Sequence, residues 1–484
     1  MTTRPLRVFV GVVLAWLFLN ALLTFENLWP TLGVRPAPAL SVEAASIILV
    51  VVWLARRGPP SRRVLAALAG LIVALALTRY AEVTAAALYG RPLNLYWDAE
   101  HLPRVAAMLA AAASPSQLAL GAIACTVVLG ALFCGARSAL RAVAAAAAMP
   151  FARRFVGGVA GTVLAMYGAG LAFDAIETED AFATPVAAAY LRQVELLFAA
   201  LGGSGVAMAA ASLPGQTSLD ALGDTDVFLV FLESYGAATY TRAEHRDALA
   251  DARAELAAAM VATDRSAVSA YVTSPTFGGA SWLAHASLLA GRETRTQEAY
   301  NRLVNGRPET LVHALAQHGH RTVALMPGLR QDWPEGAVYG FDAVYGAQTL
   351  AYRGPAFGWW RIPDQYALAK LDAEETARAP RRPLFVFFPT ITSHAPFRPT
   401  PPYQADWARL TSELPYDAGV QSVLKAAATD WDDLGPAYAR SVGYTLRSIA
   451  GYLRHRADRD LVLIVLGDHQ PPAGVAGERA SWEV

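Results

Sequence analysis

The sequence predicts a membrane domain of five helices over residues 1–175, a helical connector over 176–225 and an α/β domain over 226–484. Three observations predict this division. The first third of the chain is largely Ala, Leu, Val and Gly, arranged in long apolar runs. In the rest, short apolar runs alternate with helical patterns, which is typical of a mostly parallel sheet with helices on both faces. A chain of 484 residues is also longer than one ordinary domain.

Five apolar segments approach the length of about 20 residues that crosses a hydrocarbon core. They are Leu6–Leu23, Leu40–Leu54, Val64–Leu77, Leu118–Leu140 and Phe155–Phe173. The first segment follows Arg4 and Arg7 and therefore also has the character of a signal peptide. Four further spans and the lack of a clear cleavage site favour an uncleaved anchor.

Arginine-rich short loops predict the orientation, because such loops stay in the cytoplasm. Four arginines separate the second and third spans and four separate the fourth and fifth: Arg56, Arg57, Arg62, Arg63, Arg137, Arg141, Arg153 and Arg154. The N-terminus is then also inside, and five crossings place everything after about residue 175 outside. We expect a multi-pass protein of a bacterial cytoplasmic membrane, with its α/β domain outside the cytoplasm.

Two external segments fit this orientation. The stretch 174–180 is acidic, and the loop Tyr96–His101 combines an aromatic pair with two acids and a histidine. For that loop an interfacial aromatic belt is favoured, and contact with a lipid headgroup is the alternative. The connector is expected to be helical from Ala183 to Ala211 and to lie along the membrane surface.

Four apolar runs predict the strands of the α/β domain: Val227–Leu232, Arg321–Met326, Leu384–Phe388 and Leu461–Leu466. Between them we expect helices over Glu309–Gln317, with Gly319 as its stop, and over Ala437–Arg456. The carboxyl ends of parallel strands meet at one edge of a sheet, where such folds bind ligands. Glu233, His394, Asp468 and His469 follow strand ends and are therefore expected at that edge.

Two carboxylates and one imidazole, from Glu233, Asp468 and His469, make a set suited to a divalent metal such as Mn²⁺ or Zn²⁺. An acid after a strand is often only a helix cap or part of a solvated turn, and for Glu233 taken alone such a structural role is favoured. The run Gly467–Pro472 is more specific, because its glycine permits close approach of backbone and its prolines fix the exit.

A candidate nucleophile follows two glycines in the segment Thr273–Gly291. Ser281 stands at the expected start of a helix, where the dipole and free amides favour an anion, although a serine there is commonly only an N-cap. A metal bound to its oxygen would activate it without a Ser-His-Asp triad. Thr276 is the rival nucleophile. His285, one turn after Ser281, either stabilises a developing negative charge or packs in the core.

These blocks together resemble the alkaline phosphatase and sulfatase superfamily. The blocks are Val230–Ser234, Ser281–Gly291 and Val465–His469, and the five-span layout is similar to the lipoteichoic acid synthase type and the phosphoethanolamine transferases. The resemblance implies that Glu233, Ser281, Asp468 and His469 bind one metal, with Ser281 as nucleophile. It implies that His394 binds the phosphate or sulfate of the substrate. It also favours Ser281 over Thr276, because the sulfatase nucleophile precedes the Leu-Leu-x-Gly glycine by ten positions, as Ser281 precedes Gly291.

The chain departs from these families in several places. Ser281-Trp-Leu-Ala-His285 lacks the Pro and the Arg of the sulfatase motif that is converted to formylglycine. The two cysteines, Cys125 and Cys134, both lie in one apolar run, so the external domain lacks the disulfides common in phosphoethanolamine transferases. Arg330 and Trp333 occupy a stretch comparable to the one that carries the glycerophosphate-binding Trp and Arg of the synthase type. The relatives usually continue beyond the position of Val484, so we expect either a short product or a truncated sequence.

The predicted function is a membrane-bound, metal-dependent phosphotransferase or hydrolase that moves a phosphoryl-linked headgroup from a lipid or glycan donor to an acceptor or to water. Mn²⁺ is favoured, with Zn²⁺ or Mg²⁺ as alternatives. The substrate would be bound by His394, His285, Arg330 and Trp333. The alternatives are a sulfatase-like hydrolase and an inactive protein that binds envelope glycans. A formal net charge of zero gives no indication of a nucleic-acid partner, and the oligomeric state is left open.

Overall fold

A computed structural model describes the chain outside a few short gaps. The described residues are 3–28, 32–89, 92–99, 102–103, 106–107, 110, 113–173, 181–201, 219–358, 360–376, 380–425, 430, 433–477 and 480–484. They form two compact units, Met1–Ala87 with Arg91–Ser204, and Leu88–Gly90 with Gly205–Val484. The acidic stretch at 174–180, Glu100, His101 and the connector beyond residue 201 lie outside the described residues.

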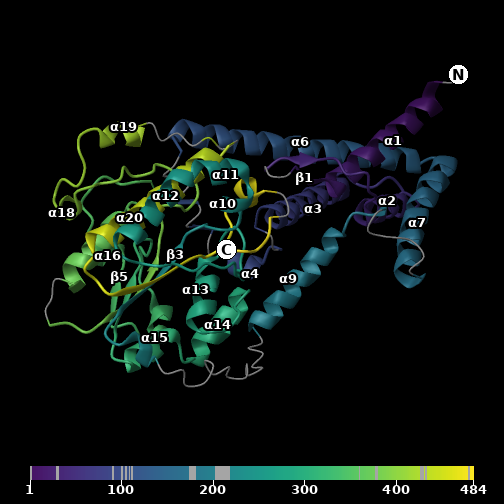
Figure 1. Cartoon of the computed structure of the whole chain (residues 1–484). Coiled ribbons are helices and arrows are strands. Elements are labelled where there is room, and N and C mark those ends of the chain that lie inside the picture. Colours follow the sequence, from purple (N-terminus) through teal and green to yellow (C-terminus); the bar gives the residue numbers. More distant parts are fainter. Residues whose placement is uncertain are drawn as a thin grey trace. The chain divides into compact units, whose positions relative to one another are not determined.

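The first unit is helical (Figure 1). Its elements are α1 (Thr3–Thr24), β1 (Glu26–Asn27), β2 (Val34–Arg35), α2 (Val42–Leu54), α3 (Arg62–Tyr89), α4 (Leu95–Asp98), α6 (Pro115–Ala147), α7 (Pro150–Phe173) and α9 (Val186–Leu201). Buried Ala, Val, Leu and Ile side chains of α1, α2, α3, α6 and α7 pack into one apolar cluster. The side chain of Asn20 ties the start of α2 to α1, because its amide donates to the Ala39 carbonyl oxygen (2.8 Å) and its oxygen accepts the Ser41 N–H (2.8 Å).

Three described helices are long and apolar enough to cross a membrane by length and composition: Arg62–Ala87, Pro115–Ala147 and Pro150–Ala172. They contain or largely overlap three of the five predicted spans. The two remaining spans fall on shorter apolar helices, Val8–Thr24 and Val42–Leu54. The count of five crossings and the orientation therefore remain predictions.

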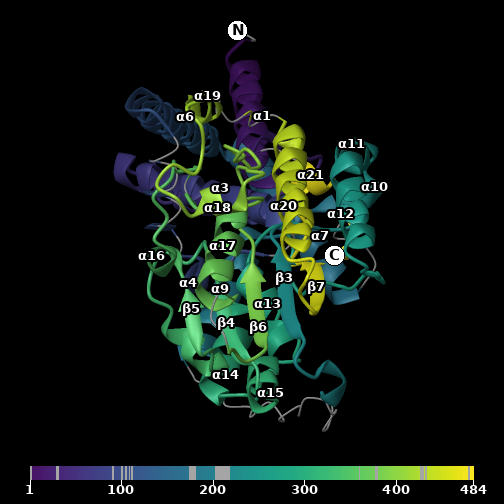
Figure 2. The ribbon, with the colours of Figure 1, turned by 60° about the vertical axis from the view of Figure 1, so that its left-hand side comes forward.

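The second unit is built on a five-stranded sheet in the order β5-β4-β6-β3-β7, which Figure 2 shows side by side. The strands are β3 (Asp226–Leu232), β4 (Arg321–Leu325), β5 (Ala343–Tyr345), β6 (Leu384–Pro389) and β7 (Leu461–Gly467). All neighbouring pairs are parallel. Each predicted strand is present, with ends that agree within a residue or two. The three-residue edge strand β5 was not predicted from the sequence.

Helices cover both faces of this sheet. They are α10 (Ala238–Thr241), α11 (Ala243–Ala248), α12 (Ala250–Ala262), α13 (Ser281–Leu289), α14 (Gln297–Gly306), α15 (Leu311–Gln317), α16 (Ala347–Leu350), α17 (Asp364–Leu371), α18 (Trp407–Leu410), α19 (Val420–Lys425), α20 (Gly435–His455) and α21 (Ala473–Ala476). Short 3-10 or π turns occupy Asp220–Leu222, Pro334–Tyr339 and Asp372–Thr376. The two predicted helices correspond to α15 and α20.

Alternation along β3 explains the two faces. Phe228, Val230 and Leu232 pack on the face covered by α12, α17 and α20, in a core that includes Tyr438 and Tyr452. The intervening residues Val227, Leu229 and Phe231 pack against α13 and α15 on the other face. Since successive side chains of a strand point to opposite faces, a run that is apolar at every position is buried on both.

The start of β3 is fixed by a buried carboxylate. Asp226 is 1% exposed, and its two oxygens accept hydrogen bonds from the Arg381 guanidinium (2.8 Å each). One oxygen also accepts the backbone N–H of Leu384 (2.8 Å), the first residue of β6, and Arg459 approaches the other (3.4 Å). This carboxylate therefore sets the register of β3 against β6.

We predict that Asp226→Ala destabilises the second unit by about 3 kcal/mol, because it leaves the partner cation without its buried counter-charge. Thermal unfolding of the detergent-solubilised protein should show a midpoint lowered by roughly 6–12 °C. The matched control is Glu298→Ala, which removes the half-exposed helical pair Arg302–Glu298 and should cost less than about 1 kcal/mol. Equal midpoints for the two variants would contradict the role of Asp226.

Candidate functional site

Three residues at the carboxyl edge of the sheet place their polar atoms together. Glu233 follows β3, and Asp468 and His469 follow β7, the neighbouring strand. Their side chains each offer one atom within 4.8 Å of the others, and all three residues are buried, at 6%, 1% and 1% exposed. The structure thus brings together the three residues that the sequence analysis proposed as metal ligands.

Asp468 joins the two strand ends. Its Oδ1 accepts the backbone N–H of Ser234 (2.8 Å) and of His469 (2.7 Å). Its Oδ2 is buried and has no hydrogen-bond partner among the described residues, and it lies 3.7 Å from His469 Nε2. A buried carboxylate oxygen left without a donor is costly, so a cation or a proton is favoured at this point.

The pKa shifts of Asp468 and His469 also favour positive charge in the cluster. Burial, with a contribution from the Glu233 carboxylate, raises the pKa of Asp468 to about 6. For His469, burial alone lowers the pKa, but the adjacent carboxylates of Asp468 and Glu233 outweigh it and raise the pKa overall. A positive charge is therefore favoured between these groups.

The ring orientation of His469 leaves its Nε2 for the cluster. Its Nδ1 lies 2.7 Å from the Gln470 carbonyl oxygen, which can only accept, so Nδ1 carries a proton. Nε2 lies 3.6 Å from Glu233 Oε1. A neutral imidazole in this tautomer presents a lone pair to a cation, and two carboxylates complete a hard, anionic donor set. These residues fit a divalent metal.

Ser281 is the fourth member of the group. Its Oγ lies 3.2 Å from Glu233 Oε2 and 3.1 Å from His469 Nε2. The helix α13 begins at Ser281 itself, with Ala280 as its N-cap and no capping side chain. Ser281 is therefore not an N-cap, which was the alternative role considered for it. Its hydroxyl instead donates a hydrogen bond to Glu233.

A strained turn presents this serine. Gly278 (φ +66°), Gly279 (φ +152°) and Ala280 (φ +63°) all have positive φ, which glycine adopts freely and alanine rarely. Gly278 N–H donates to the Gln470 carbonyl oxygen (3.1 Å), and Ser274 Oγ donates to the Asp468 carbonyl oxygen (2.6 Å). The turn is therefore fastened to the end of β7 beside the cluster.

The rival nucleophile, Thr276, is also buried, and its Oγ1 has no hydrogen-bond partner among the described residues. This hydroxyl therefore makes no hydrogen bond to Glu233, Asp468 or His469 in the described part of the chain. Its backbone N–H donates to Ser274 Oγ (3.1 Å). The geometry therefore favours Ser281 as the nucleophile.

The two histidines proposed for substrate binding differ in their surroundings. The His285 ring packs on Phe231 (4.6 Å between centroids) and Phe387 (5.4 Å), and burial lowers its pKa to about 4. It is neutral at pH 7, so it carries no charge that could stabilise an anion. His394 follows β6; its Nδ1 donates to the Ala395 carbonyl oxygen (2.7 Å), and burial lowers its pKa. Charges on His469 and Asp468 also act on the His394 pKa, more weakly than burial and the hydrogen bond to Ala395.

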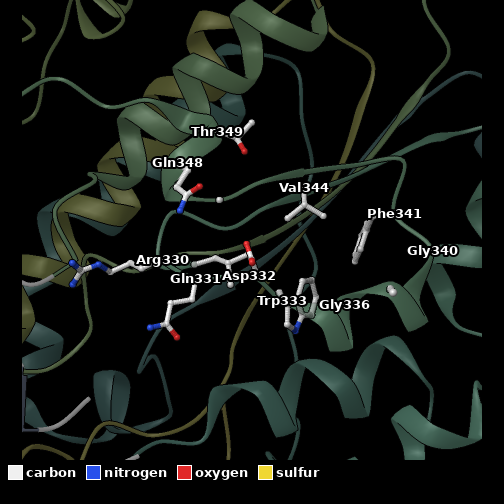
Figure 3. Close-up of a pocket in the computed structure, with 13 residues that line it drawn as sticks. Arg330, Gln331, Asp332, Trp333, Gly336, Gly340, Phe341, Val344, Gln348 and Thr349 are labelled. Atoms are coloured by element: carbon white, nitrogen blue, oxygen red, sulfur yellow. The ribbon is translucent and has the colours of Figure 1, made fainter. Parts of the chain in front are cut away.

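Arg330 and Trp333 line a separate pocket of about 300 Å³ beyond the ends of β4 and β5 (Figure 3). Trp333 stacks on Tyr339 (5.6 Å between centroids) at one end of it. Figure 3 shows the Arg330 guanidinium at the opposite end, directed away from Trp333. The strand β6 separates β4 from β3, so this pocket is on the site's edge of the sheet but is not in contact with Glu233 in the described structure.

Several supporting residues were not proposed from the sequence. Glu233 is held through its backbone, since its N–H donates to Thr390 Oγ1 (3.0 Å) and its carbonyl oxygen accepts Ser393 Oγ–H (2.6 Å). Ser234, in a left-handed conformation (φ +57°), donates its hydroxyl to Glu233 Oε1 (2.9 Å). Thr390 and Ser393 lie in the polar run that follows β6, so their position in the sequence could have predicted a place at the site. For Ser234 the only indication in the sequence was that it follows Glu233.

Gly467 has a different role from the one expected. We expected it to let the backbone approach a ligand, but a Cβ there would lie 1.6 Å from the Tyr235 carbonyl oxygen. The glycine is needed because the ends of β3 and β7 approach each other so closely. It thereby brings Asp468 next to Ser234.

Comparison with solved structures finds matches at low sequence identity, and no curated protein matches the sequence. An alkaline phosphatase superfamily protein from Vibrio parahaemolyticus has 16% identity and a TM-score of 0.35 over 51% of this chain and 55% of that chain. The lipoteichoic acid synthase LtaP from Listeria monocytogenes has 14% identity and a TM-score of 0.35 over 51% and 56%. The chain thus spans little more than half of these two proteins.

The integral membrane lipooligosaccharide phosphoethanolamine transferase A (EptA) from Neisseria meningitidis has 15% identity and a TM-score of 0.44 over 95% of this chain and 82% of that chain. At TM-scores below 0.5 these likenesses carry no argument about function. The family is shown by the sequence itself, because the family model described as Sulfatase matches residues 225–483, more than half of the chain. The resemblance drawn from the three sequence blocks is confirmed at this level: the chain belongs to the sulfatase family.

Proposed function

We propose that this protein is a membrane-bound phosphotransferase or phosphohydrolase that forms a phosphoryl intermediate on Ser281. The observation that carries the proposal is the position of Ser281 Oγ, which lies 3.2 Å from Glu233 Oε2 and 3.1 Å from His469 Nε2. These two residues form one cluster with Asp468, whose Oδ2 has no hydrogen-bond partner among the described residues. A nucleophile held against metal ligands needs no separate triad base. The absence of the Pro and Arg of the formylglycine motif after Ser281 supports phosphate over sulfate chemistry.

A divalent cation bound by Glu233, Asp468, His469 and Ser281 would lower the pKa of the serine hydroxyl and neutralise charge on the phosphoryl oxygens. We favour Mn²⁺, because oxygen ligands outnumber nitrogen in this set. The chain's own groups orient the serine: Glu233 Oε2 accepts a hydrogen bond from its hydroxyl, and the turn at Gly278–Ala280 fixes its direction. The free amides at the start of α13 favour an anion there.

The reaction has two balanced halves. Ser281 Oγ forms a bond to phosphorus as the bond to the donor's oxygen breaks, and the serine proton leaves with the released alcohol. An acceptor hydroxyl or water then forms a bond to phosphorus, the serine bond breaks, and the serine regains a proton. His394 binds the anionic phosphoryl group and stabilises its position. Three apolar helices in the same chain support a lipid or lipid-linked glycan as the donor.

We predict that Ser281→Ala abolishes covalent labelling while Thr276→Val, the matched control, retains it. The test is the intact mass of the full-length protein in detergent with Mn²⁺ and a panel of phospholipids and aryl sulfates. An adduct is expected on the wild type and on Thr276→Val, and its fragments should map to Ser281. Labelling of Ser281→Ala but not of Thr276→Val would make Thr276 the nucleophile.

The same experiment separates the other classes. An adduct that forms only with aryl sulfates would identify a sulfatase-like hydrolase. Metal bound without any adduct or released headgroup would favour the alternative of an inactive protein that binds envelope glycans.

We predict one tightly bound Mn²⁺ per chain after chelation and reconstitution. Asp468→Asn should weaken its binding more than about 100-fold, since it removes a direct ligand and outer-shell partners alone account for 10–100-fold. Titration calorimetry measures the affinity, and Glu298→Gln is the control carboxylate on a helix outside the site. Unchanged affinity in Asp468→Asn would exclude this cluster as the metal site.

A further inference from the structure

One buried carboxylate outside the metal cluster is bonded to the loop that follows β6. Asp364 is the first residue of α17 and is 1% exposed. Its Oδ1 accepts the backbone N–H of Ile391 (2.7 Å), and its Oδ2 accepts the backbone N–H of Thr392 (3.2 Å) and the hydroxyl of Thr445 (2.9 Å). The Asp364 N–H donates in return to Thr392 Oγ1 (3.3 Å). Asp364 is therefore joined to this loop both by its side chain and by its backbone.

The loop needs an acceptor at this position. Ile391 and Thr392 lie beyond the end of β6, where no neighbouring strand accepts their backbone N–H groups. A buried N–H without an acceptor is costly, and a carboxylate can accept from several donors at once. Burial raises the pKa of the Asp364 carboxyl group, and the hydrogen bonds from the loop and from Thr445 oppose that shift.

The same loop holds the backbone of Glu233. Residues 391–394 form a turn, closed by a hydrogen bond from the last N–H to the first carbonyl oxygen (3.1 Å). Within this turn Ser393 is 1% exposed, and its hydroxyl donates to the Glu233 carbonyl oxygen (2.6 Å). Glu233 Oε2 accepts the hydroxyl of Ser281 (3.2 Å). A continuous series of hydrogen bonds therefore leads from Asp364 through the turn to Glu233 and the nucleophile.

The two hydrogen bonds to the Glu233 backbone are supported differently. Its N–H donates to Thr390 Oγ1 (3.0 Å), and the sheet itself fixes Thr390, whose N–H donates to the Phe231 carbonyl oxygen (2.8 Å). Its carbonyl oxygen is bonded to Ser393, and that turn is fixed by Asp364. The second support is therefore the one that depends on a side chain outside the sheet.

We propose that Asp364 is a positioning residue for Glu233 and that it acts through the hydrogen bond from Ser393. The inference rests on the metal site of the proposed function and adds a residue that sets the affinity of that site. Groups that orient a metal ligand without touching the metal change its affinity by about 10–100-fold when they are replaced.

The test is the Mn²⁺ affinity of the full-length protein in detergent, measured by titration calorimetry on Asp364→Asn, Ser393→Ala and the double variant. Asparagine keeps one carbonyl oxygen and replaces the other oxygen by an amide donor, which cannot accept a loop N–H. We expect each single variant to weaken Mn²⁺ binding about tenfold. The double variant should bind no more weakly than Ser393→Ala, because both changes break the same connection.

Thr445→Val is the matched control. It removes a hydrogen bond to the same buried carboxylate but leaves the contacts of Asp364 with the loop, so the Mn²⁺ affinity should be unchanged. Thermal unfolding of each variant separates a loss of stability from a loss of affinity. Should Asp364→Asn fail to fold, Thr392→Val removes the hydroxyl that accepts the Asp364 N–H. It should show a smaller loss of affinity, which disappears when Ser393 is already alanine.

The outcomes are distinct. Unchanged Mn²⁺ affinity in Asp364→Asn would overturn the inference and leave the proposed function standing. Equal losses in Asp364→Asn and Thr445→Val would also overturn it, since the effect would then come from the fold around the carboxylate. A further tenfold loss in the double variant would show that Asp364 does not act through Ser393. A wild type that binds no Mn²⁺ would remove the metal site of the proposed function and this inference with it.

Discussion

The site depends on the carboxylate of Asp468 and its contact with the backbone at the end of β3. One oxygen accepts two backbone N–H groups, from Ser234 on the neighbouring strand end and from His469, so it cannot turn away. The other oxygen is thereby directed, without a partner in the described structure, at the atoms of Glu233 and His469. One residue both joins the two strands and creates the local need for positive charge.

The nucleophile is held by the same strand end. The loop before α13 is bound to β7 through the carbonyl oxygens of Asp468 and Gln470, and its three positive φ angles are retained because both ends are fastened. Gln470 extends this support, since its side-chain oxygen accepts the Ala238 N–H (3.2 Å) and its amide donates to the carbonyl oxygens of Ser481 and Glu483 (2.9 Å each). A shift of β7 would therefore move the metal ligands and Ser281 together.

The sequence predicted the central strands and the grouping of Glu233, Asp468 and His469 for one physical reason. Parallel strands buried on both faces appear as continuous apolar runs, and their carboxyl ends meet at one edge. The short strand β5 was missed because three residues are too few to show a pattern. The sequence left open whether His285 stabilises a negative charge or packs in the core, because its contacts with two phenylalanines from β3 and β6 are not visible in the local pattern.

The order of the strands gives the proposed substrate a direction. Along the carboxyl edge the cluster of Glu233, Asp468 and His469 lies at β3 and β7, His394 follows at β6, and the pocket of Arg330 and Trp333 lies beyond β4 and β5. A donor whose phosphoryl group is at Ser281 would have this pocket of about 300 Å³ on the same edge of the sheet for a more distant part of the molecule. That volume suits a headgroup or a sugar. A recognition site away from the nucleophile is what a large, extended donor requires, because interactions remote from the reacting bond hold the phosphoryl group in position for attack.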